Sequence, residues 1–168
     1  MPSLEIETHL PSDFSPNSRV WIYQSSRLFF LSEVFELEDM LNQFVDTWQS
    51  HGSKVKGYAN LFFGTFIVFM ADESATGVSG CSTDSSVRVI KEIEKRFNVQ
   101  MFNRETLAFL IKEKIERIPM QQLDYAIQNN FVNGDTLYFN NLVQTKKELE
   151  ENWMIPLKAS WLNRFVTK

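Results

Sequence analysis

Two segments of this sequence carry apolar side chains at consecutive positions over the length of a strand. They are RVWIYQ (Arg19–Gln24) and TFIVFMA (Thr65–Ala71). Successive side chains of a strand point to opposite faces of its sheet, so both segments present large apolar groups to both faces. A sheet that contains them has to be covered on each face.

The order of the expected elements narrows the fold class. Apolar residues at three- and four-residue steps predict one helix from Val34 to about Trp48, with a cap at Ser32 and an end at Gly52, and a second helix after Cys81. The expected strands are residues 19–24, 55–62, 65–71 and 99–102. The resulting order, βαββαβ, is that of the ferredoxin-like fold, an α+β arrangement with a four-stranded antiparallel sheet and two helices on one face.

The 168 residues are expected to form one domain with three parts. Residues 1–18 contain three prolines among short polar residues, which predicts an irregular N-terminal arm. Residues 19–103 hold the ferredoxin-like core. Residues 104–168 are expected to form a mixed C-terminal extension that covers the open face of the sheet, with a helix starting at the capping box Thr145–Glu148. A second copy of the sheet in a homodimer is the alternative cover.

Composition and charge restrict the partners. The net charge of -4 and the pI near 5.3 disfavour nucleic acid, whose backbone attracts basic surfaces. Aromatic strands of this topology also occur in RNA-recognition domains, but Leu61 stands where the motif requires a basic residue and Thr65 where it requires an aromatic one. A single cysteine permits no internal disulfide. No secretory or membrane-spanning segment is evident, so we expect a cytoplasmic protein without a membrane partner.

A loop of small residues, GVSGCSTD (Gly77–Asp84), precedes the second helix and carries the only cysteine. Backbone N–H groups at the start of that helix, with nearby hydroxyl groups and one arginine, are suited to a small anion such as a carboxylate or phosphate. The candidate ligand-binding residues lie in or just beyond the Ser79–Ser86 segment: Ser79, Gly80, Cys81, Ser82, Thr83, Ser85 and Arg88. The competing interpretation is structural, because an unpaired cysteine in a tight connection is commonly buried.

Cys81 is also the candidate for a catalytic nucleophile. The cysteine-phosphatase pattern places five residues between cysteine and arginine, whereas six separate Cys81 from Arg88. The only histidines, His9 and His51, are distant in the sequence, so neither a Cys–His pair nor a metal site is indicated. We expect a non-catalytic domain without metal or cofactor that binds a small anionic ligand or a protein partner, and a small enzyme using Cys81 is the alternative.

Several segments give the chain a resemblance to a bacterial family whose members often carry the label "ABC transporter ATPase". They are RVWIYQ (Arg19–Gln24), SGCSTDSSV (Ser79–Val87), FNNLV (Phe139–Val143), TKKELEENW (Thr145–Trp153) and SWLNRF (Ser160–Phe165). The resemblance implies no established activity. The ATPase label conflicts with the residues, because a phosphate-binding P-loop requires G-x-x-x-x-G-K-[ST] and the richest glycine segment, Gly77–Ser82, contains no lysine.

Overall fold

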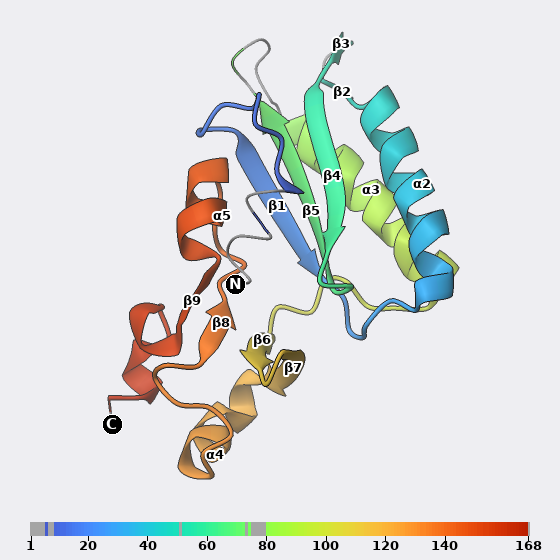
Figure 1. Ribbon diagram of the computed structural model, residues 1–168. Helices are drawn as coiled ribbons and strands as arrows, with labels where there is room; N and C mark the ends of the chain where they lie inside the picture. Colours follow the sequence, from blue (N-terminus) through green and yellow to red (C-terminus); the bar gives the residue numbers. More distant parts are fainter. Residues whose placement is uncertain (1–5, 7–8, 51, 73, 75–79, 168) are drawn as a thin grey trace.

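The structure is a computed structural model that describes residues 6, 9–50, 52–72, 74 and 80–167. It is an α+β protein with antiparallel sheets of three and four strands, and the short hairpin β2 (Gln49–Ser50) and β3 (Ser53–Lys54) stands apart from both. The three-stranded sheet and its helices come from the first part of the chain, and the four-stranded sheet comes from the last part (Figure 1).

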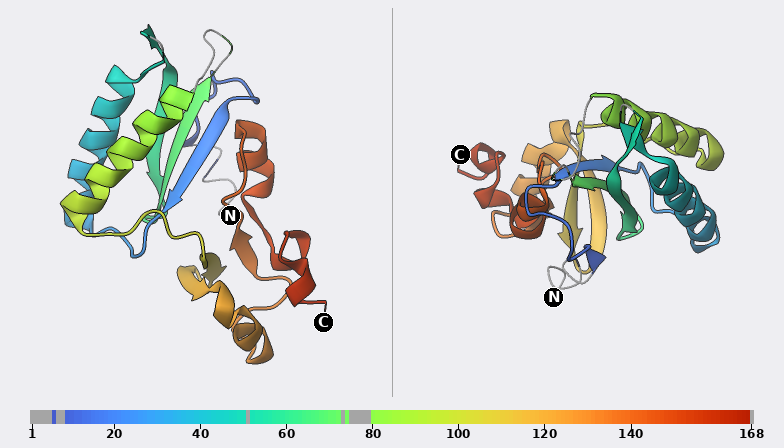
Figure 2. Two further views of the ribbon diagram at one scale, coloured as in Figure 1. Left: turned by 180° about the vertical axis from the view of Figure 1, so that it is seen from behind. Right: turned by 90° about the horizontal axis from the view of Figure 1, so that it is seen from above.

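The three-stranded sheet has the order β1-β5-β4, with both pairings antiparallel. Its strands are β1 (Arg19–Gln24), β4 (Lys56–Phe62) and β5 (Phe66–Asp72). Helices α2 (Leu31–Thr47) and α3 (Gly80–Phe97) lie side by side on one face of this sheet (Figure 2). Leu37, Leu41, Ile90 and Ile93 are fully buried there against Phe69 and its neighbours. The predicted helical stripes therefore face the sheet.

The start and end of α2 differ from the prediction. The helix begins one residue before Ser32, and the Phe30 N–H donates a hydrogen bond to Glu33 Oε1 at 2.8 Å. That carboxylate satisfies one of the donors at the helix N-terminus, so no hydroxyl cap is needed. Gly52 does not end the helix, which stops at Thr47; with φ of +81° it lies in the turn between β2 and β3.

The expected fourth strand, Val99–Phe102, is not a strand. The Ser26 N–H and the Gln100 carbonyl are hydrogen-bonded at 2.8 Å, and the Gln100 N–H donates to Ser26 Oγ at 2.9 Å. These bonds hold the segment against the turn after β1 and not along the edge of β1. Val99 and Met101 are buried in the helix-side core, and the chain then continues into the second sheet.

The four-stranded sheet has the order β7-β6-β8-β9. Its strands are β6 (Thr106–Ile111), β7 (Lys114–Pro119), β8 (Leu137–Phe139) and β9 (Met154–Pro156). Helices α4 (Leu123–Gln128) and α5 (Lys146–Asn152) and three 3-10 turns, Met120–Gln122, Leu157–Ala159 and Asn163–Phe165, complete this part. The predicted cap of α5 is confirmed, because Thr145 Oγ1 accepts a hydrogen bond from the Glu148 N–H at 3.1 Å.

The second face of the three-stranded sheet is covered by residues from both ends of the chain. The ring centre of Phe66 lies 4.7 Å from that of Phe139, in a tilted arrangement, and 5.1 Å from that of Trp153, which it meets edge-on. Leu10 and Phe14 from the N-terminal part pack in the same apolar cluster. The face that the sequence required to be covered is thus closed within one chain.

Asp72, at the end of β5, holds the N-terminal segment on the sheet. Its side chain is 3% exposed and accepts hydrogen bonds from the Ser15 N–H at 3.0 Å and the Ser74 N–H at 2.9 Å. Lys56 Nζ lies 3.7 Å away. The hydrogen bonds from Ser15 and Ser74 lower the pKa of Asp72 to about 2.

Replacing this carboxylate is expected to destabilise the protein in a pH-dependent way. Because the pKa in the folded state is depressed, the stabilisation is complete above the unfolded-state value near 4 and is lost as the pH falls through about 2. Urea denaturation of Asp72→Asn at pH 7 should show a loss of about 2 kcal/mol in the free energy of unfolding, and this difference should shrink below pH 4. The exposed Asp39→Asn is the control, and an equal loss in both variants would contradict this role.

Candidate functional site

The described part of the small-residue loop predicted to bind an anion, residues 80–84, lies at the start of α3. Ser79 lies outside the described residues, and the backbone of Gly80, Cys81 and Ser82 is helical. Ser86 is buried, donates its hydroxyl hydrogen to the Thr83 carbonyl at 2.7 Å and lies 3.2 Å from the Tyr23 hydroxyl. Ser86 therefore joins α3 to β1 and is a structural residue.

The structure brings two of the predicted ligand-binding residues, Ser85 and Arg88, to one surface. Both line a groove of about 510 Å³ between α2 and α3. Glu92, one turn after Arg88, lines the same groove. A carboxylate beside the arginine reduces the attraction for an anion, so this groove is less suited to the predicted ligand than its hydroxyl groups suggest.

The described part of the chain offers no histidine partner for Cys81. His9 packs edge-on against Phe62 at 6.4 Å, and Phe62 belongs to the apolar cluster on the sheet face opposite α3. His51 lies outside the described residues. The Cys–His pair that thiol catalysis requires is therefore not formed with His9.

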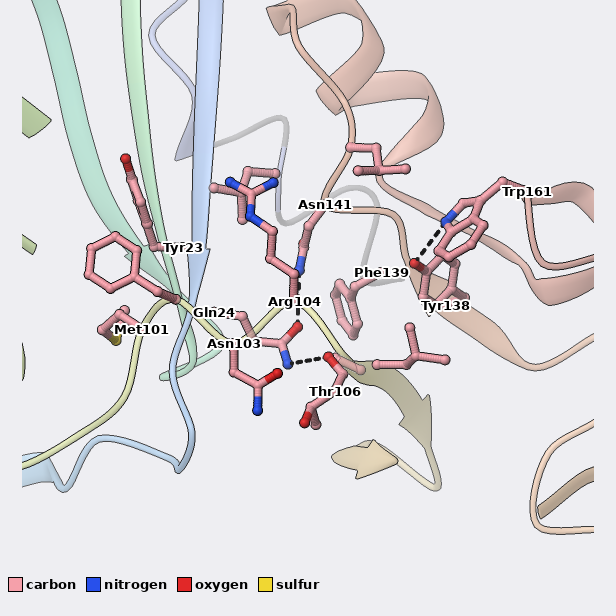
Figure 3. Close-up of a pocket in the computed structure, with 15 residues that line it drawn as sticks. Tyr23, Gln24, Met101, Asn103, Arg104, Thr106, Tyr138, Phe139, Asn141 and Trp161 are labelled. Atoms are coloured by element: carbon pink, nitrogen blue, oxygen red, sulfur yellow. Dashed lines mark hydrogen bonds between the residues drawn. The ribbon is translucent and has the colours of Figure 1, made fainter. Parts of the chain in front are cut away.

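A second concave site lies where β1, β8 and the segment after α3 meet, and we name it the inter-sheet cleft (Figure 3). Its volume is about 80 Å³. Its polar lining consists of Gln24, Asn103, Arg104, Thr106 and Asn141. Its apolar and aromatic lining consists of Ile22, Tyr23, Met101, Phe102, Leu107, Ala108, Tyr138, Phe139, Leu142 and Trp161.

A chain of hydrogen bonds fixes the amide side chains of the cleft. Trp153 Nε1 donates to Asn141 Oδ1 at 2.9 Å. Asn141 Nδ2 donates to Gln24 Oε1 at 3.0 Å, and Gln24 Nε2 donates to the Thr106 carbonyl at 3.1 Å (Figure 3). Each amide uses both its oxygen and its nitrogen, which determines its orientation. The chain links the two sheets and holds one wall of the cleft in a single arrangement.

Aromatic groups line the cleft on both sides of these amides, Tyr23 on one side and Tyr138 with Trp161 on the other (Figure 3). Trp161 Nε1 donates a hydrogen bond to the Tyr138 hydroxyl oxygen at 3.1 Å (Figure 3). Burial raises the pKa of Tyr138, so its hydroxyl group is neutral at physiological pH. Trp161 is 42% exposed and Phe102 is 40% exposed, so both lining residues keep aromatic surface accessible to solvent.

Arg104 gives the cleft its charge. It is the one charged residue among those described in the lining, which contains no aspartate, glutamate or lysine. Its side chain is exposed and extends between β1 and Asn141 (Figure 3). It forms no ion pair with any described residue. The guanidinium group is thus available to a ligand, and the surrounding walls favour a partly apolar anion.

The lining also limits the chemistry of the cleft. Among the described lining residues there is no cysteine, histidine, serine or carboxylate, and these are the usual nucleophiles and general bases. Within this lining, Arg104 and the hydrogen-bonded amides are the groups suited to contact a polar ligand.

Comparison with known proteins adds no assignment. No protein-family model, curated protein or solved structure matches the chain. None of the described helices is long and apolar enough to cross a membrane. Within the same part of the chain, no group of three or more His, Cys, Asp or Glu residues is placed to hold a metal ion.

The sequence analysis did not identify the inter-sheet cleft. Gln24, Arg104 and Asn141 are far apart in the chain, and paired asparagines such as Asn140–Asn141 are typical of turns. One signal was present in the segments that carry the family resemblance. Three of them line the cleft: RVWIYQ through Gln24, FNNLV through Asn141, and SWLNRF through Trp161.

The hydrogen-bonded amides are expected to stabilise the joint between the two sheets. Gln24→Ala leaves the Asn141 amide and the Thr106 carbonyl without their partner, which should reduce the free energy of unfolding by about 1–3 kcal/mol. A double-mutant cycle with Asn141→Ala should give a coupling energy of about 1 kcal/mol in urea denaturation. Gln43→Ala, on the exposed surface of α2, is the matched control and should change stability by less than about 0.5 kcal/mol. Additive effects of the two cleft variants would contradict the network.

Proposed function

We propose that this protein binds a small carboxylate-containing ligand in the inter-sheet cleft, without catalysis. The observation that carries the proposal is the charge of the cleft. Arg104 is its one charged residue among those described, while the protein as a whole carries a net charge of -4. A cation in a concave, partly apolar site of an acidic protein selects locally for an anion. The ligand class is the one predicted from the sequence, but the site is a different one.

The chemistry of the walls supports a carboxylate in particular. The guanidinium group of Arg104 presents parallel N–H groups that match two carboxylate oxygens. The neutral Tyr138 and the exposed face of Trp161 suit the apolar part of the ligand. A volume of about 80 Å³ holds only a few heavy atoms, so the ligand is small or inserts one end.

The alternative of an enzyme using Cys81 has less support. Cys81 lies in the first turn of α3, whereas the cleft residues Met101, Phe102 and Arg104 follow the end of this helix at Phe97. A nucleophile at one end of the helix does not serve a ligand at the other. We propose a non-catalytic cytoplasmic protein, as its composition indicates.

We also propose a finer description of the fold and family. The order β1, α2, β4, β5, α3 and the strand order β1-β5-β4 support a ferredoxin-like core over residues 19–103, with its fourth strand missing and residues 104–168 as an extension. The five segments that carry the resemblance remain the basis for proposing membership of the bacterial family named above. The absence of a P-loop in the sequence argues against an ATPase.

Binding of benzoate tests the proposed function. Titration of the full chain, followed by the NMR signal of the Trp161 indole N–H, should show saturable binding. Arg104→Gln should weaken this binding at least tenfold, because the charge-assisted hydrogen bonds are lost. Arg88→Gln is the matched control: it removes an exposed arginine from the groove between α2 and α3 and should leave the affinity unchanged. The proposal would be overturned if Arg104→Gln bound benzoate as tightly as the unmodified chain, or if only Arg88→Gln lost affinity for benzoate.

A second candidate function, self-association, is favoured by one observation. Leu28, Phe30, Leu31 and Phe35 are 57–79% exposed at the start of α2. Leu31 and Phe35 are one turn apart and share a helix face. Charges of both signs lie beside them, in the pairs Arg27–Glu33 and Arg96–Glu36. A surface that is apolar with both signs of charge is complementary to a second copy of itself.

Sedimentation equilibrium tests self-association. The protein should show a concentration-dependent dimer, and Leu31→Glu should weaken it at least tenfold by placing a charge in the apolar contact. Phe131→Glu changes an equally exposed aromatic residue elsewhere and should not affect the dimer. A chain that stays monomeric at all concentrations would exclude this candidate.

A further inference from the structure

The outer edge of β1 is only partly paired. β1 pairs with β5 on its inner edge. On its outer edge the Val20 N–H donates to the Gln144 carbonyl at 3.0 Å, and the Lys146 N–H donates to the Ser18 carbonyl at 2.9 Å. These bonds, with the bridge between Arg19 and Thr145, occupy only the first part of the strand.

The rest of this edge is open. In an antiparallel ladder the backbone groups of alternate residues face the same edge, so Ile22 and Gln24 follow Val20 in facing outward. No backbone group of the described chain pairs with their outward N–H and C=O groups. Residues 141–145 line the groove beside β1, but in the described chain the backbone pairing between the two segments ends at Val20.

A groove of about 340 Å³ follows the open edge. It shares Ile22, Tyr23, Arg104, Asn141 and Leu142 with the inter-sheet cleft, so the two hollows form one continuous site along β1. The charged residues of the groove lining in the described chain, Arg19 and Arg104, are both cations. The site thus combines an unpaired strand edge with positive charge.

We propose that the ligand of this site is the C-terminal end of an extended peptide, which pairs with the open edge of β1 at Ile22 and places its carboxylate on Arg104. This inference rests on the proposed function and specifies its ligand class. Backbone pairing at a sheet edge is a general mode of peptide recognition, and a terminal carboxylate adds the charge that Arg104 selects.

A chain end fits this site better than a continuous chain. The bridge between Arg19 and Thr145 occupies the first part of the edge, so a peptide pairs only with the part beyond Val20. The span between Val20 and Gln24 accommodates about three extended residues at ~3.3 Å each. An uncharged peptide of this length carries its negative charge at the C-terminus, and this is the end that Arg104 attracts.

Three probes separate this inference from the proposed function: N-acetyl-trialanine with a free carboxylate, the same peptide as its C-terminal amide, and benzoate. Each is titrated into the full chain and followed by NMR. The free-carboxylate peptide should bind at least tenfold tighter than the amide, and Arg104→Gln should abolish that preference. Binding of the free-carboxylate peptide should slow hydrogen exchange of the Ile22 N–H at least tenfold, whereas binding of benzoate should leave this exchange rate unchanged.

A proline at Ile22 tests the pairing directly. Proline is tolerated on an edge strand where the N–H faces outward, so Ile22→Pro removes the donor without removing a bond to β5. This variant should lower the affinity for the free-carboxylate peptide at least tenfold and the affinity for benzoate less than twofold. The exchange measurement on the unmodified chain stands by itself if the variant does not fold.

The outcomes are distinct. Benzoate binding that depends on Arg104, with no peptide-induced protection of the Ile22 N–H, would overturn the peptide inference and leave the proposed function in place. If the unmodified chain binds neither benzoate nor the peptide, both the proposed function and the peptide inference are overturned. Peptide binding that is equal for the acid and the amide would show strand pairing without carboxylate selection and would also overturn the inference.

Discussion

The burial of β5 on both faces is the constraint on which the rest of the structure depends. All seven residues of this strand are buried. Ile67 and Phe69 pack with the helices, whereas Phe66 and Val68 pack with the residues that follow β8 and with the N-terminal segment. Removing either cover would expose large aromatic and aliphatic groups to water. The central strand therefore ties the two sheets together, although they share no backbone ladder.

Beyond this apolar packing, hydrogen bonds connect the two sheets. Arg117 of β7 donates to the Ser25 carbonyl at 2.9 Å and to Thr65 Oγ1 at 3.0 Å, and Gln24 bonds the Thr106 carbonyl nearby. These contacts set the position of the second sheet at the end of β1. Gln24 and Thr106 also line the inter-sheet cleft, so part of its polar lining is a consequence of how the two sheets are joined.

Local signals predicted several elements along the chain. The helix stripes, the β4–β5 connection near Gly64 and the cap at Thr145 all depend on residues close in sequence. The β6–β7 hairpin gave no such signal. Its turn places Lys112 and Glu113 at φ of +52° and +67°, a conformation that glycine and asparagine normally mark. The prediction of a fourth strand was wrong for another reason. Val99–Phe102 has residues typical of a strand, but the backbone of Gln100 is hydrogen-bonded to Ser26.

The sequence by itself determined that a two-faced apolar sheet exists and which helices flank it. These properties follow from periodicity and composition, which act over a few residues or over the whole chain. Only the tertiary structure decided where the candidate site lies. Gln24, Arg104 and Asn141 meet because the second sheet docks at the open end of β1, and no local pattern encodes that juxtaposition. The sequence specifies which side chains are present, whereas the concave surface that brings them together forms only when distant segments pack against each other.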